Sequence, residues 1–116
     1  MNVKEFYLDT DGDYTKALSL MMNDILVAKL LGKFMANNPC EQIISSYEEK
    51  NYRDVFTGSH ALKGVAGNLA LTPLFNIASK ITEATRNSDD VNLDEDIEEL
   101  RRIYSLLKEK YQEYIA

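Results

Sequence analysis

Apolar side chains near the C-terminus recur at alternating intervals of three and four residues. They are Ile97, Leu100, Tyr104, Leu107, Tyr111 and Tyr114. Because an α-helix turns once in 3.6 residues, this spacing places all six on one stripe of a single long helix. Such a stripe is stable in water when other helices cover it, so the pattern predicts a helical bundle.

The rest of the chain shows helix start signals and lacks strand patterns. Asn38-Pro39 and Thr72-Pro73 each combine a capping residue with proline at the first helical position, and Asn92 opens a capping box. We expect helices over 13–20, 23–36, 38–50 and 51–71, and further helices starting at 72 and 92. The second should point Ile25, Leu26, Leu30 and Phe34 inward. Residues 1–13 give no clear pattern.

The fold class that these signals indicate is all-α. We expect an antiparallel helical bundle with a four-helix core, short accessory N-terminal helices and one domain over residues 1–116. No run of residues alternates apolar and polar side chains on both sides of a tight turn, which argues against paired strands.

Composition excludes several function classes. The 116 residues carry a net charge of −6, so the chain lacks the basic stripe of a nucleic-acid binder. The most apolar stretch, 21–35, is interrupted by Asp24, Lys29 and Lys33, which argues against membrane insertion. One cysteine, Cys40, allows no internal disulfide or multi-cysteine metal site. With no targeting segment evident, we expect a cytoplasmic monomer without a metal or cofactor of its own.

The segment 51–71 breaks the ordinary pattern of an amphipathic helix. Wound at 100° per residue, it turns one set of residues toward the core: Val55, Ser59, Leu62, Ala66 and Leu69. The opposite face carries Arg53, Thr57, His60, Gly64 and Gly67, with Lys63 at its edge. The single histidine of the chain is therefore expected to face solvent.

Glycines surround this histidine although each costs roughly 1 kcal/mol in a helix interior relative to alanine. Gly64 and Gly67 share its face, and Gly58 lies on the flank. One interpretation is that another molecule's backbone must approach the imidazole closely. The alternative is that small residues permit tight packing between helices.

An exposed neutral imidazole is a nucleophile that can accept a phosphoryl group on a ring nitrogen. Lys63, three residues later, could neutralise phosphate oxygens. The sequence has no P-loop for a nucleotide. We therefore expect a phosphate carrier without ATP-dependent kinase activity, and its classification as an enzyme stays open.

At these residues a family resemblance is evident. The run His60-Ala61-Leu62-Lys63-Gly64, followed by Leu69, resembles the signature of histidine-containing phosphotransfer (HPt) domains. The segment Leu74 to Ala84 is similar to the helix that follows in that family, and the opening 6–14 resembles that of small stand-alone members.

The resemblance implies a role in a two-component phosphorelay. His60 would accept a phosphoryl group from the aspartate of one response-regulator receiver domain and pass it to another, and a hybrid or sensor histidine kinase would supply the relay. Mg²⁺ would belong to the receiver. Lys63 would stabilise the phosphate, and the partner-binding residues would be Gly64, Gly67, Thr57, Thr82 and Ser79. The alternative is a helical adaptor that binds a receiver without carrying phosphate.

Two positions depart from the family pattern. Ala70 stands where the family often has glycine, a change expected only to stiffen the helix end. The family's Gln or Glu that hydrogen-bonds the imidazole falls at Thr82, whose side chain is shorter. Orientation of His60 would then come from Ser79, Glu83 or water, and the phosphorylated nitrogen is not specified.

Overall fold

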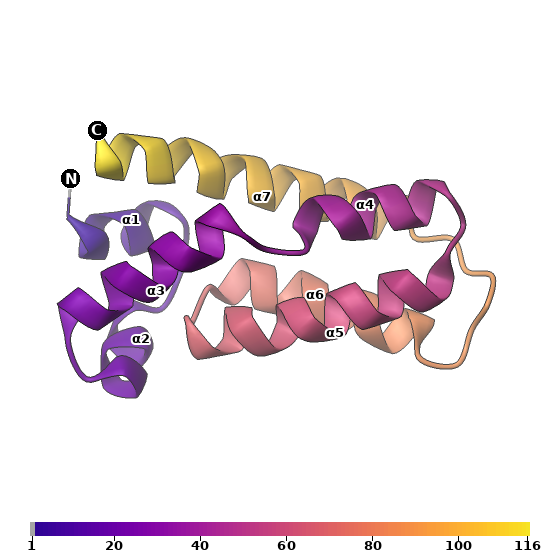
Figure 1. Cartoon of the computed structure of the whole chain (residues 1–116), viewed down its shortest axis with the longest axis horizontal. Helices are drawn as coiled ribbons and strands as arrows, with labels where there is room; N and C mark the ends of the chain where they lie inside the picture. Colours follow the sequence, from indigo (N-terminus) through magenta and orange to yellow (C-terminus); the bar gives the residue numbers. More distant parts are fainter. Residues whose placement is uncertain (1) are drawn as a thin grey trace.

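The computed structural model describes residues 2–116, and within that range it contains helices and no strand. The helices are α1 (Val3–Asp9), α2 (Tyr14–Met21), α3 (Asp24–Ala36), α4 (Cys40–Glu48), α5 (Tyr52–Asn68), α6 (Thr72–Thr85) and α7 (Asp94–Ile115) (Figure 1). The predicted all-α bundle is confirmed.

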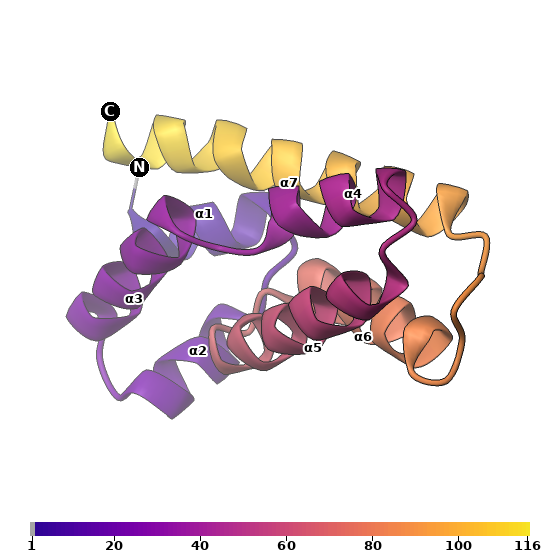
Figure 2. The same cartoon turned by 45° about the vertical axis from the view of Figure 1, so that its right-hand side comes forward.

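Helices α4 to α7 form the four-helix core. The antiparallel pair α5 and α6 packs closely together, α4 lies against α5 and α7, and α6 also contacts α7 (Figure 1). The accessory helices α1 to α3 gather at one end. There α1 lies along the C-terminal part of α7, and α2 lies beside the C-terminal end of α5 (Figures 1 and 2). The stripe predicted on α7 faces the core, with Ile97, Leu100, Tyr104 and Leu107 buried.

The helices begin within two residues of the predicted starts, and side chains that accept bonds from their first backbone N–H groups account for several of them. Thr72 is an exception, because it is the first residue of α6 and no side chain caps that helix. The Asn51 Oδ1 accepts a hydrogen bond from the Asp54 N–H at 3.2 Å. The Asn38 Oδ1 accepts one from the Cys40 N–H at 3.0 Å, and the Asn92 Oδ1 accepts one from the Asp94 N–H at 2.9 Å.

Helix α5 ends at Asn68, three residues earlier than predicted. The Leu71 N–H donates to the Ala66 carbonyl at 2.9 Å and the Ala70 N–H donates to the Gly67 carbonyl at 3.1 Å. This is a Schellman ending, which requires a left-handed residue, and Ala70 supplies it with a φ of 53°. Ala70 therefore does not stiffen the helix as expected: it lies beyond the helix end, in a conformation that costs a non-glycine residue about 1 kcal/mol.

The sequence did not predict where helix α1 lies, yet this helix contributes the large buried rings of Phe6 and Tyr7. The Tyr7 hydroxyl donates to the Leu69 carbonyl at 2.6 Å, and the Asp13 N–H donates to the Ala70 carbonyl at 2.9 Å. Burial raises the pKa of Tyr7, which keeps the hydroxyl protonated as the donor. The N-terminal segment is thus bonded directly to the end of α5.

The predicted inward face of α3 is partly wrong. Ile25 is 81% exposed and Leu26 is 37% exposed, whereas Val27 and Leu31 are fully buried. Phe34 is buried as predicted. The helix is apolar around most of its circumference, so its pattern does not specify which side packs against α1 and α2.

Candidate functional site

His60 lies on the exposed face of α5, near the middle of the helix. The opposite face carries the five predicted core residues, Val55, Ser59, Leu62, Ala66 and Leu69, all of which are buried. The predicted core face is confirmed, and the predicted outward face is exposed except at Gly67, which is partly buried. The site is therefore an imidazole held on a rigid helix and directed toward solvent.

The ring of His60 stacks on the ring of Phe56, one helical turn earlier. Their centroids are 5.8 Å apart and their planes differ by 16°. The Cζ atom of Arg86 lies over the Phe56 ring, 5.4 Å from its centroid. Arg86 follows the last residue of α6, so this contact joins the end of α6 to the histidine helix.

The Arg86 guanidinium is itself held by a fork of two hydrogen bonds to the Glu83 carboxylate. Its Nη2 donates to Glu83 Oε1 at 2.9 Å and its Nε donates to Glu83 Oε2 at 3.4 Å. The pKa of Glu83 is lowered mainly by the hydrogen bond from Arg86 and its charge, and to a smaller extent by the charge of Lys63. Lys63 is half-buried at the edge of the exposed face of α5.

The side chains that sequence analysis considered for orienting His60 are bonded elsewhere. Thr82 is fully buried, and its hydroxyl donates to the Ala78 carbonyl at 2.7 Å and contacts the Ser59 hydroxyl at 3.0 Å. The Ser79 hydroxyl donates to the Phe75 carbonyl at 2.8 Å. The assignment of Thr82 to a partner surface is therefore wrong, because its residue lies inside the α5–α6 interface.

The three glycines of α5 differ in their surroundings. A Cβ on Gly64 would meet nothing within 4 Å, so this position is open. A Cβ on Gly67 would lie 3.2 Å from the Phe75 ring, and one on Gly58 would lie 2.8 Å from Ile43 Cγ1. Tight packing thus accounts for Gly67 and Gly58, whereas Gly64 is open to the approach of another molecule.

Thr57 is exposed on the same helix, one turn before His60, and its hydroxyl donates to the Arg53 carbonyl at 3.1 Å. It borders a surface hollow of about 400 Å³ between the start of α5 and the end of α6, together with Phe56 and Arg86. This hollow lies next to the stacked pair and is open to solvent.

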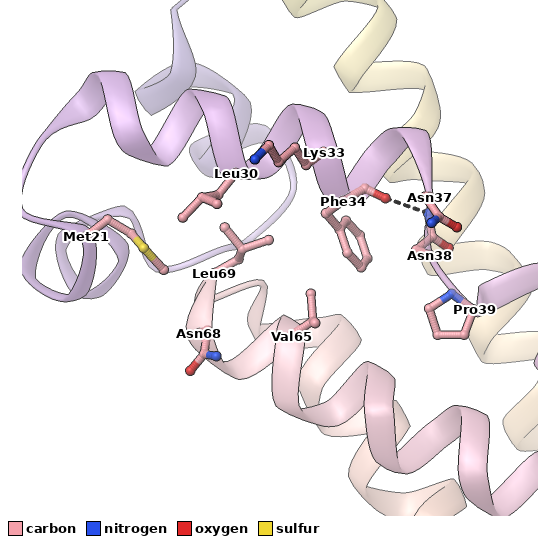
Figure 3. A pocket seen from close by; sticks show the side chains of 10 residues that line it. All are labelled: Met21, Leu30, Lys33, Phe34, Asn37, Asn38, Pro39, Val65, Asn68 and Leu69. Carbon is pink, nitrogen blue, oxygen red and sulfur yellow. Dashed lines mark hydrogen bonds between the residues drawn. The ribbon is translucent and has the colours of Figure 1, made fainter.

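A second hollow, of about 440 Å³, lies on the other side of α5. It is bounded by α2, α3, the turn before α4 and the C-terminal half of α5 (Figure 3). Its lining is largely apolar, with Leu30, Phe34, Val65 and Leu69 directed into it, and the Asn38 amide donates to the Phe34 carbonyl at 3.0 Å at its rim. Val65 is 41% exposed, but it lies about 140° around the helix from His60, so this hollow opens on a different side of α5.

The described residues also bear on metals and membranes. No group of three or more His, Cys, Asp or Glu side chains within 2–116 is arranged to hold a metal ion. None of the helices in this range has both the length and the apolar character that crossing a bilayer requires.

Comparison with known protein families places this chain. Residues 29–112, more than two thirds of the chain, match the family described as Hpt domain. The chain belongs to the Hpt domain family. Comparisons with curated proteins and with solved structures gave no significant match. The family resemblance inferred from the histidine motif is confirmed.

Two residues beside His60 in this Hpt domain were not predicted from the sequence, namely Phe56 and Arg86. Phe56 precedes His60 by four residues, the spacing at which side chains meet on a helix, so this contact could have been predicted. Arg86 could not, because its position over Phe56 depends on where α6 ends relative to α5.

Proposed function

We propose that this Hpt domain is a phosphorelay intermediate in which His60 reversibly carries a phosphoryl group between receiver domains. The observation that carries the proposal is the exposed imidazole of His60 beside the open position of Gly64. A visiting domain can reach this ring without displacing any part of the chain. Lys63 at the edge would offset the charge of the phosphoryl oxygens.

The transfer is a displacement at phosphorus. The lone pair of one imidazole nitrogen forms an N–P bond as the bond between phosphorus and the receiver's aspartyl oxygen breaks, and that oxygen keeps the electron pair. The other ring nitrogen keeps its proton. Transfer onward is the reverse step with a second receiver. Such chemistry needs mainly positioning and charge neutralisation, and Mg²⁺ on the receiver would supply part of the latter.

Partner contacts extend from His60 over Gly64, with Thr57, Lys63 and Ser79 toward the edges. A hybrid or sensor histidine kinase would charge the first receiver. We expect the exchange to involve a monomer in the cytoplasm.

The test is incubation with a phosphorylated receiver domain. We expect an adduct on this protein that is labile in acid and stable in alkali, and that the His60→Gln variant cannot form. Because the chain has a single histidine, loss of the adduct in this variant assigns it to His60. A comparable adduct on the variant would disprove the mechanism, whereas binding of the receiver without transfer to the wild type would favour the adaptor function.

A further inference from the structure

The orientation of the His60 ring is a separate requirement from its exposure. The terminal torsion of a histidine side chain is broad, so the helix backbone alone leaves the ring plane loosely defined. A nitrogen that attacks phosphorus must present its lone pair in line with the bond that breaks, and poorly held reacting groups lose rate. Some other group must therefore limit the rotation of the ring.

Phe56 is placed to do this by stacking. The nearly parallel rings, 16° apart in plane and 5.8 Å between centroids, fix the plane of the imidazole relative to α5. The lone pair of the unprotonated nitrogen and the N–H bond of the other nitrogen both lie in that plane. Stacking on one face therefore leaves both nitrogens free, whereas a hydrogen bond from a protein side chain would occupy one of them.

Phe56 is in turn held from α6. The Arg86 guanidinium lies over its ring, and the fork to Glu83 keeps that guanidinium from rotating away. Helices α5 and α6 thus meet in a continuous series of contacts that runs from Glu83 through Arg86 and Phe56 to His60. The hydroxyl of Thr82, by contrast, is bonded inside the bundle.

We propose that Phe56 is the positioning residue of His60 and that Arg86 positions Phe56. The inference rests on the proposed function, since it assigns how the phosphate-accepting ring is oriented. Stacking takes the place of the hydrogen bond that was expected from Ser79, Glu83 or water.

The experiment compares Phe56→Leu, Phe56→Tyr and Arg86→Gln with the wild type. One measurement is the NMR shift of the His60 ring protons, which are resolved because the chain has one histidine. The other is the rate of His60 phosphorylation, with phosphoramidate and with a saturating phosphorylated receiver. Phe56→Leu should abolish the upfield ring-current shift and slow both reactions by roughly 2- to 10-fold, the factor that an aromatic stacking energy represents. Phe56→Tyr should restore both, and Arg86→Gln should give a smaller change in the same direction.

Tyr52 provides the matched control. It lies one turn before Phe56 and lines the same hollow, but its ring packs on Tyr47. Tyr52→Leu should leave the His60 shifts and both rates unchanged. Wild-type rates in Phe56→Leu, or an equal loss in Tyr52→Leu, would overturn the proposal. If Phe56→Leu does not fold, the other two variants still test the proposal. Unchanged His60 shifts in Arg86→Gln would overturn the role of Arg86. A phosphorylation rate of Phe56→Tyr far below that of the wild type would overturn the role of Phe56.

The two proposals fail in distinguishable ways. A wild-type protein that accepts no phosphate from either donor contradicts the proposed function, while the NMR comparison still tests the stacking. A wild-type protein that is phosphorylated normally, with variants equal to it, contradicts the positioning alone.

Discussion

Replacement of Gly64 by alanine should stabilise this Hpt domain, although the residue lies within α5, one turn from His60. The added Cβ would meet nothing within 4 Å, so it brings no steric cost. The gain in helix propensity is about 1 kcal/mol in the free energy of unfolding. For a domain near this size that corresponds to a rise in Tm of about 4 °C.

Gly58 is the matched comparison on the same helix. Alanine there gains the same propensity, but its Cβ would lie 2.8 Å from Ile43 Cγ1, an inner atom of a fully buried side chain. Overpacking of this kind costs roughly 1–3 kcal/mol, so Gly58→Ala should be neutral to destabilising by about 2 kcal/mol. Urea denaturation followed by far-UV circular dichroism gives both values.

A larger side chain at position 64 tests whether this position is needed for phosphate transfer. Gly64→Gln should fold normally and still impair transfer from a phosphorylated receiver, because its side chain occupies the space beside His60 that a partner would enter. If Gly64→Ala failed to stabilise, or if Gly64→Gln transferred phosphate at the wild-type rate, the interpretation of Gly64 as an opening for partners would be refuted.

Two further predictions concern buried groups. Tyr7→Phe removes the donor to the Leu69 carbonyl and should lower the free energy of unfolding by about 1–3 kcal/mol, measured by urea denaturation; an unchanged value would mean that this bond does not secure α5. Burial, followed by the negative charge of Glu41, raises the pKa of the Cys40 thiol to about 12, so a thiol reagent should modify the native protein only as fast as it unfolds. In the unfolded chain the thiol has its ordinary pKa of about 9, so the contribution of Cys40 to the free energy of unfolding is fully present below pH 9. That contribution is lost as the pH rises toward 12. Urea denaturation of the wild type and of Cys40→Ser at several alkaline pH values would test this.

The sequence predicted those parts of the fold that depend on local rules. Cap residues such as Asn51 start helices through bonds to the next turn, and the three-and-four spacing on α7 identifies its buried stripe. The exposure of His60 followed from the same periodicity. These features require only that the helix forms and that one side of it is covered.

The features that the sequence did not predict depend on contacts between distant elements. The rotation of α3 that exposes Ile25 is set by its neighbours, since its own pattern is apolar on most sides. The sequence alone does not distinguish the role of Gly67 from that of Gly64, because the difference depends on Phe75 of α6, which packs against Gly67. Thr82 was assigned to the partner surface from its distance along the sequence from His60. That distance does not show that the Thr82 side chain is directed into the bundle.

The bonds from the N-terminal segment to the end of α5 affect how this protein can be trimmed. The family match begins at residue 29, yet the donors to the Leu69 and Ala70 carbonyls come from Tyr7 and Asp13. An excised fragment cut at the family boundary would leave both acceptors without these partners and would uncover the α7 surface that Phe6 now covers. The region that matches the family is therefore shorter than the region that keeps the end of α5, the helix of His60, bonded and covered.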